Sequence, residues 1–150
     1  MGYPVSTLRN LRASNIGSEV GLHTDEEADL NRIVREMAGH KSLPLSSQGL
    51  LRRYVTDMRA VIREIARVLV LGGRATFVIG NSTLRGVFIK NSRAISLLGQ
   101  QHGLKLLSAK SRVLPNNRRY LPPPSYGNGA IHNRMRTEVV VTFKKAACRP

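Results

Sequence analysis

The feature that most constrains the fold is a long amphipathic helix that ends at a double glycine and leads into an apolar strand. Between Leu51 and Leu69, apolar residues recur at three- and four-residue steps, the period of one helix face, and arginines lie mostly on the other face. Gly72 and Gly73 end this helix. The run ATFVI at 75–79 is almost wholly apolar. We therefore expect a strand buried on both faces of a largely parallel sheet.

Further segments give a pattern in which helices and strands alternate. An earlier helix is predicted from Thr24, whose hydroxyl would cap the first turn, to Gly39. A later helix is predicted at about 91–101, followed by strands at 104–113 and 137–143. Because a crossover helix joins two parallel strands, this order predicts an α/β fold, and the 150 residues form a single domain by length. The earlier helix has an apolar stripe of Leu30, Ile33, Val34 and Met37.

Positive charge is concentrated in the second half of the chain. Residues 1–64 contain nine Lys and Arg against eight Asp and Glu, whereas residues 65–137 contain twelve Lys and Arg and no acidic residue. Such a stretch projects a positive field that attracts polyanions, above all nucleic acid phosphates. The charge alone fits equally well with cations that only aid solubility, or that contact RNA without specificity.

Several functional classes find no support in the sequence. It has no apolar run of about 18 residues to span a bilayer and no hydrophobic signal segment, so we expect a cytoplasmic protein. The single cysteine, Cys148, has no Cys or His at metal-ligand spacing, and the four histidines are scattered, so no metal site is predicted. His102, beside Gly103, is expected to be a helix C-terminal residue.

A long segment between the last two strands is the first candidate binding element. It spans residues 114–135, is rich in Pro, Gly and Asn, and is too long for a routine connection. Arginine holds phosphates and tyrosine stacks on unpaired bases, so we expect a clamp for nucleic acid. In the opposing interpretation, the tyrosine packs on the sheet edge and the arginines are solvated. The expected clamp residues are Arg118, Arg119 and Tyr120, with Arg134 and Arg136 extending the track.

Two further candidates lie elsewhere. Gly80, Asn81 and Ser82 follow the strand at 75–79, and ligands of open α/β sheets lie at the carboxyl ends of strands. We expect this triplet at the rim of a substrate pocket, although the same residue types favour a plain turn. Arg9 and Arg12, three residues apart in LRNLR, either contact a substrate phosphate or belong to a surface turn.

In their order, several segments resemble a class I S-adenosylmethionine-dependent methyltransferase. REIARVLVLGGRATFVIGNS, the later GLKLL and the last strand RTEVVVTF resemble the C-terminal half of that fold. RVLVLGGRATFVIGNSTLRGVFIKNS, with RYLPPP and RMRTEVV, is similar to the site-specific DNA methylases that modify N4 of cytosine or N6 of adenine. The resemblance covers about residues 3–144. It implies a partial Rossmann-like sheet in which 75–79 is the fifth strand, 104–113 the sixth, and 137–143 the antiparallel seventh, inserted between them.

The resemblance also implies what is missing. The family binds its cofactor with a Gly-rich loop after the first strand and an acidic residue for the ribose, and carries an Asp/Asn-Pro-Pro-aromatic motif after the fourth. The resemblance places this chain after those motifs in the family's order of strands. It therefore implies no cofactor-binding residue here and leaves the catalytic residues unknown. It implies a DNA methyltransferase, present as a C-terminal fragment or split-enzyme half, which would need an N-terminal half to use S-adenosylmethionine.

The alternative is a basic nucleic-acid-binding protein without catalysis. The two can be separated by the strand at 75–79. An unpaired edge there favours an incomplete methyltransferase sheet, whereas a sheet that closes on itself favours the binding protein.

Overall fold

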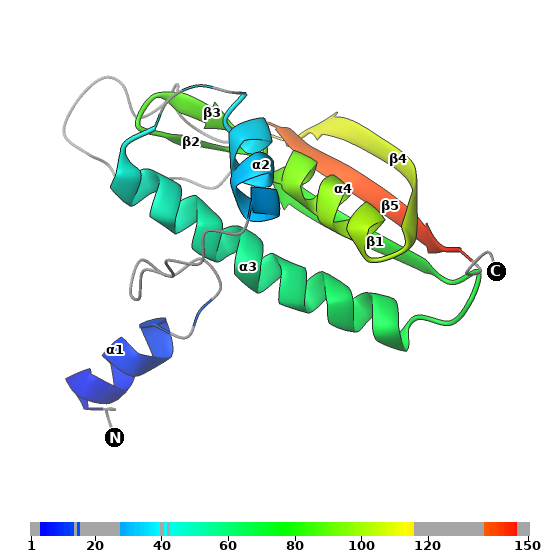
Figure 1. Cartoon of the computed structure of the whole chain (residues 1–150), viewed down its shortest axis with the longest axis horizontal. Coiled ribbons are helices and arrows are strands. Elements are labelled where there is room, and N and C mark those ends of the chain that lie inside the picture. Colours follow the sequence, from blue (N-terminus) through cyan, green and yellow to red (C-terminus); the bar gives the residue numbers. More distant parts are fainter. Residues whose placement is uncertain are drawn as a thin grey trace.

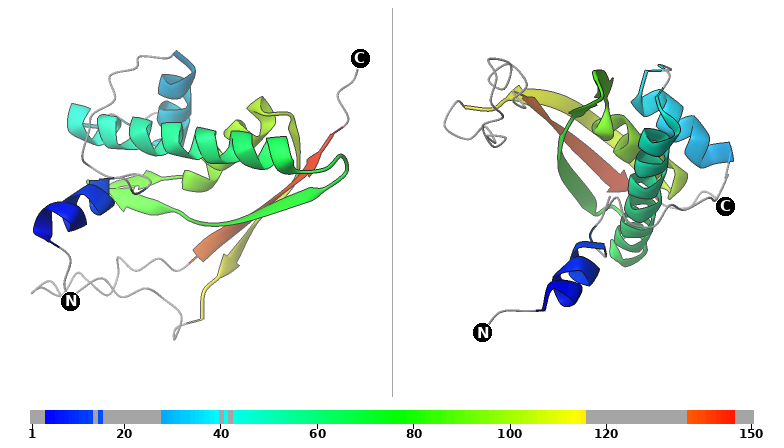
Figure 2. Two further views of the ribbon diagram at one scale, coloured as in Figure 1. Left: turned by 90° about the horizontal axis from the view of Figure 1, so that it is seen from below. Right: turned by 90° about the vertical axis from the view of Figure 1, so that its left-hand side faces the viewer.

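Helices cover one side of a small sheet in the computed structural model. The structure describes residues 4–13, 15, 28–39, 41, 43–115 and 137–146. The helices α2, α3 and α4 lie on the same side of the sheet (Figures 1 and 2). None of the described helices is both long and apolar enough to cross a bilayer. The elements in chain order are α1 (Val5–Ala13), α2 (Ala28–Met37), α3 (Leu45–Val68), β1 (Arg74–Gly80), β2 (Ser82–Leu84), β3 (Val87–Ile89), α4 (Asn91–Gln101), β4 (Leu104–Val113) and β5 (Thr137–Lys145).

The main sheet has the order β1-β5-β4, and β5 is antiparallel to both of its neighbours. The strands β1 and β4 therefore run parallel, and α4 makes the crossover between them. This arrangement confirms the expected insertion of the last strand, antiparallel, between the two before it. The bounds of α4 and β4 agree with the predicted ranges.

The outer edge of β1 is unpaired among the described residues, because β5 is the strand bonded to it and β2 and β3 form a separate hairpin. The prediction that this strand is buried on both faces of a largely parallel sheet is wrong, because one of its faces is open and both strand pairs of the described main sheet are antiparallel. Phe77 and Ile79 pack against the core, while Thr76 is exposed and Val78 is 52% exposed. The apolar run is misleading because valine is also common on solvent-facing sheet positions, and periodicity cannot separate these cases in five residues.

One apolar core joins the helices to the covered face of the sheet. The Phe143 ring packs edge-on against Phe77, with the ring centroids 5.8 Å apart. A side chain at Gly99 would overlap the Phe143 ring, so α4 lies closely on β5 at this point. The predicted stripe of α2 is confirmed. The fully buried large side chains are Phe143, Leu30, Ile33, Met37, Ile62, Ile89, Ile95, Leu98, Leu104, Val55 and Val141.

The helix starts differ from those expected. The proposed cap at Thr24 falls outside the described residues, which resume at Ala28. The helix predicted from Leu51 begins six residues earlier, at Leu45, directly after Pro44. The first turns contain serines and a glycine that break the apolar period, but proline is well suited to a helix start because it has no N–H to leave unpaired.

Two elements were not predicted at all. The segment with Arg9 and Arg12 is a helix, α1, rather than a surface turn. Residues 82–89 form the β2-β3 hairpin, whose two-residue turn consists of Arg85 and Gly86. Both turn residues have positive φ, 47° and 78°, as in a type I′ turn. Arginine is an unusual residue for this turn, so the sequence carried only the glycine as a signal.

Candidate functional site

The carboxyl ends of β1 and β4 and the start of β5 lie side by side at one end of the sheet. In the strand register, Gly80 is opposite Glu138, and Glu138 is opposite Arg112, with which it forms an ion pair. The segment 116–136 is outside the described residues, but its flanking residues Pro115 and Thr137 are at this same end. The described residues that flank the long connecting segment thus lie at the same end of the sheet as the end of β1.

A set of hydrogen bonds fixes the end of β1 to the first turn of α4. The Asn81 Oδ1 atom accepts hydrogen bonds from the backbone N–H and the hydroxyl of Ser92, each at 3.1 Å. Asn91 Nδ2 donates to the Gly80 carbonyl at 2.9 Å and to the Ser82 hydroxyl at 3.3 Å. Asn81 therefore caps α4 from outside the helix, replacing the local side-chain cap that α4 lacks.

Through these hydrogen bonds, the predicted triplet at 80–82 stabilises the contact between β1 and α4. The Asn81 oxygen and the Ser82 hydroxyl are both engaged with α4, which makes the end of β1 a rigid platform. A role at a pocket rim stays a prediction. The sequence signal for the platform is the repeated dipeptide Asn-Ser, at 81–82 and 91–92, although no local pattern indicates that the two copies meet.

Both ends of the β2-β3 hairpin connect to this platform, because β2 follows Asn81 and β3 ends just before Asn91. Lys90, which follows β3, donates its backbone N–H to the Met37 carbonyl at 2.9 Å. Beside it, Arg93 of α4 forms an ion pair with Glu36 of α2 at 2.6 Å. The end of α2, the hairpin and the start of α4 are therefore joined at the same end of the sheet.

The remaining predicted nucleic-acid residues are only partly described. Arg9 is exposed on α1, and Arg12 lies on the same helix, although its side chain is outside the described part. Arg53 of α3 donates to the Ala13 carbonyl at 3.0 Å and so ties the end of α1 to α3. The clamp residues outside the described part are Arg118, Arg119, Tyr120, Arg134 and Arg136.

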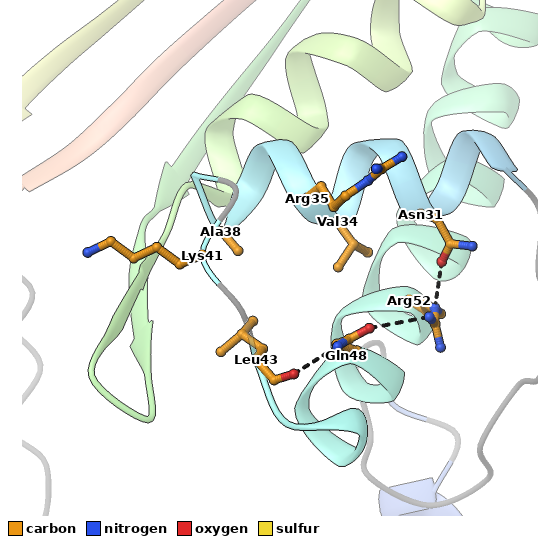
Figure 3. Close-up of a pocket in the computed structure, with 8 residues that line it drawn as sticks. All are labelled: Asn31, Val34, Arg35, Ala38, Lys41, Leu43, Gln48 and Arg52. Atoms are coloured by element: carbon orange, nitrogen blue, oxygen red, sulfur yellow. Dashed lines mark hydrogen bonds between the residues drawn. The ribbon is translucent and has the colours of Figure 1, made fainter.

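A pocket of about 470 Å³ lies between α2 and the start of α3 (Figure 3). Its polar side chains bond one another. Arg52 donates to Asn31 at 2.8 Å and to Gln48 at 3.4 Å, and Gln48 donates to the Leu43 carbonyl at 2.7 Å. Two further cations, Arg35 and Lys41, point away from the hollow in Figure 3. The lining groups therefore stabilise the helix junction and do not converge on a ligand.

Titratable groups within the described part offer no candidate metal site. No group of three or more His, Cys, Asp or Glu side chains lies close enough there to hold a metal ion. His102 is the C-cap residue of α4, as expected. Burial lowers the pKa of its imidazole, and the nearby Arg63 and Arg59 lower it further, so the ring favours its neutral form. Burial raises the pKa of the Tyr54 hydroxyl, which stays protonated.

Comparison with known proteins gives a likeness in structure alone. No protein-family model matches the sequence, and no curated protein matches it. The solved structure of a "Putative DNA Modification Methylase" from Thermus thermophilus, in complex with S-adenosyl-L-methionine, aligns with a TM-score of 0.52 and 17% identity. The alignment covers 73% of this chain and 44% of that protein. A selenomethionine structure of the same protein aligns over 65% and 38% of the two chains, with 18% identity and a TM-score of 0.48.

This chain therefore spans less than half of the length of the methylase that it matches. At such low identity the likeness shows the fold. It agrees with the strand order and with the expected α/β class, a partial sheet with an antiparallel last strand and flanking helices. The chain has part of a methyltransferase-like fold.

Proposed function

We propose that this chain forms the DNA-facing part of an S-adenosylmethionine-dependent DNA methyltransferase, and that the cofactor site is supplied by an N-terminal methyltransferase half outside it. The observation that carries the proposal is the outer edge of β1, which pairs with no strand among the described residues, in a sheet whose fold resembles part of a DNA modification methylase. A central strand without its neighbour is an unstable feature, because it exposes a row of backbone donors and acceptors.

The described residues do not fit the cofactor by themselves. Binding of an adenosine ribose requires an acidic side chain whose oxygens are available. At the carboxyl end of β1 the carboxylate of Glu138 is paired with Arg112, and the Asn81 oxygen is bonded to Ser92. No step of the reaction is therefore assigned to the cofactor on this chain.

The chain's own part in the reaction is to hold DNA at the end of the sheet where β1 finishes, at Gly80. A methyltransferase acts on a base that has been turned out of the duplex, and the displaced strand must be held while this happens. Gly80, Asn81 and Ser82 form the rim beside the base, on the platform fixed by α4. The phosphate and stacking contacts come from Arg9 and Arg12 of α1 and from the segment between β4 and β5, through Arg118, Arg119, Tyr120, Arg134 and Arg136.

Binding of a duplex oligonucleotide, measured by fluorescence anisotropy at several salt concentrations, tests this proposal. We expect saturable binding whose affinity falls steeply with salt. The double variant Arg118→Ala, Arg119→Ala should reduce the slope by about 0.9 for each phosphate that is no longer neutralised. The matched control is Arg74→Ala, Lys144→Ala, which removes the same charge at the opposite end of the sheet.

The two variants separate the proposal from its alternative. An oriented DNA-binding edge predicts a large loss of affinity for the first pair and a small one for the control. Equal losses would mean that the chain attracts DNA by its overall charge of +15, as a basic binding protein without an oriented site would. Absence of any binding by the folded chain would refute both.

A further inference from the structure

The β2-β3 hairpin presents one packed face and one free face. Ser82 pairs with Ile89, Thr83 with Phe88, and Leu84 with Val87. The side chains of Leu84, Val87 and Ile89 pack against the core. On the other face Thr83 is exposed and Phe88 is 51% exposed. The hairpin thus holds an aromatic ring in solvent on a rigid support.

The turn of the hairpin holds the backbone of an arginine, Arg85, in a strained conformation. Arg85 has a φ of 47°, the left-handed region, which a residue with a Cβ adopts at a cost in free energy. Asparagine or glycine at this turn position would be less strained. Backbone strain of this kind clusters at functional sites, such as ligand clamps. Within the described part, the Arg85 guanidinium forms no ion pair or side-chain hydrogen bond, and the Phe88 ring packs on no other aromatic ring.

The location of the hairpin favours a polyanion as its ligand. It begins at Ser82, two residues after the end of β1, and Figure 1 shows it continuing beyond that end on the side of α2. The chain from 65 to 137 has no acidic residue to pair with the Arg85 guanidinium. The ring and the cation therefore stand beside the edge to which the proposed function assigns DNA.

We propose that the β2-β3 hairpin is a DNA-binding element, in which Phe88 stacks on an unpaired base and the Arg85 guanidinium holds a backbone phosphate. This inference rests on the proposed function and extends it. It adds the hairpin as a second contact to the DNA, and it names the unstacked strand as the part of the DNA that the hairpin binds. An exposed aromatic ring is a sequence-tolerant stacking surface, and arginine grips two phosphate oxygens at once. The Asn81 and Asn91 network holds the hairpin at a fixed position relative to the end of β1.

The chain contains no tryptophan, so Phe88→Trp introduces a single fluorescent reporter at the proposed contact. We expect its emission to be quenched saturably by a single-stranded oligonucleotide and by a duplex with one extrahelical base. A fully paired duplex of the same length should quench less. Phe88→Thr, which repeats the residue across the hairpin, should weaken binding of the single strand about tenfold.

Arg85→Asn gives a sharper test, because binding and folding should respond in opposite directions. The variant relieves the positive φ, so its melting temperature should rise, while its affinity for the single strand falls and the salt slope of that binding decreases by about 0.7. Arg85→Lys keeps the charge and should lose only part of the affinity. Arg74→Asn, the same charge loss at the other end of β1, is the matched control and should leave the quenching unchanged.

Emission of the Phe88→Trp variant that does not change at saturating DNA would overturn this inference while leaving the proposed function intact. An equal change with polyglutamate would also overturn it, in favour of an acidic protein partner. An Arg85→Asn variant with an unchanged salt slope would remove the phosphate contact. If the unmodified chain binds no DNA at all, the proposed function fails together with the inference.

Discussion

The two faces of the three-stranded sheet are built from alternate residues of the same strands, yet they differ in packing and in charge. On the covered face Phe77, Val141 and Phe143 pack under α4. On the open face Lys144 lies directly between Arg74 and Lys105 in one row across the strands. Like charges opposite each other destabilise a sheet, whereas the covered face is filled to the point that Gly99 has no room for a methyl group.

Folding and the proposed function therefore use different parts of this sheet. The covered face satisfies its apolar residues with the chain's own helices. The open face and the outer edge of β1 have no helix or strand on them within the described part of the chain. Under the proposed function, an N-terminal methyltransferase half would pack on these surfaces, and the cations on the open face would favour an acidic surface there.

The largest difference between the faces should appear at two adjacent residues of β5. Phe143→Ala should lower the free energy of unfolding by about 3–5 kcal/mol, because it leaves a cavity under α4. Thr142→Ala, one residue away on the open face, removes only the hydroxyl contact with Thr76 at 3.3 Å and should cost less than about 1 kcal/mol. Urea unfolding measures both. Similar losses would mean that the open face is packed as tightly as the covered one.

An intermediate effect is expected at the platform that joins the sheet to α4. Asn81→Ala should cost about 1 kcal/mol, because the Ser92 N–H loses its acceptor. Asn81→Asp keeps an acceptor near the helix N-terminus and should be tolerated. Asn91→Asp should not be, since Asn91 acts as a donor to Gly80 and Ser82. Equal urea midpoints for the two aspartate variants would contradict these assigned directions.

A smaller effect of opposite sign is expected on the open face. Lys144→Glu replaces two like-charge neighbours with two attractive ones and should raise stability by about 0.5 kcal/mol at low salt. Lys110→Glu is the control, because its cross-strand neighbour is the uncharged Val140. The gain should vanish in molar salt. A stability loss at Lys144 in thermal melts would show that the row of cations does not repel.

The smallest effect should be a pH dependence from His102. Its folded pKa lies below the ordinary value, so the unfolded chain binds the proton more readily than the folded chain. Stability is then fully present above about pH 7 and decreases as the pH falls through the unfolded pKa near 6.5. His102→Gln should flatten this decrease, measured as the urea midpoint between about pH 7.5 and pH 5. An unchanged profile would mean that other groups cause it.

Periodicity predicted the elements that build the covered face. The spacing of Leu30, Ile33 and Met37 marked α2, and the strand predicted at 104–113, after the helix that ends near Gly103, is β4. The insertion of β5 between two parallel strands followed from the family resemblance. No local pattern contains strand order, because hydrogen-bonded neighbours such as Val78 and Val140 are far apart in sequence.

The parts that escaped prediction lack a strong local signal. The hairpin has arginine where its turn favours asparagine, and α1 is a short helix whose apolar residues are exposed, among them Leu8 at 50% and Leu11 at 54%. The burial of β1 was overestimated because an uncovered sheet face cannot be recognised from the composition of one strand. The role of Asn81 depended on Ser92, a contact between residues eleven positions apart.

The most direct test of the central claim is a calorimetric titration of S-adenosylmethionine into the purified chain at low salt, without and with double-stranded DNA. Circular dichroism first establishes that the sample is folded. We predict no saturable heat from the cofactor in either case, together with clear binding of the DNA. Saturable binding of S-adenosylmethionine to this chain alone would contradict the claim that the cofactor site lies outside it.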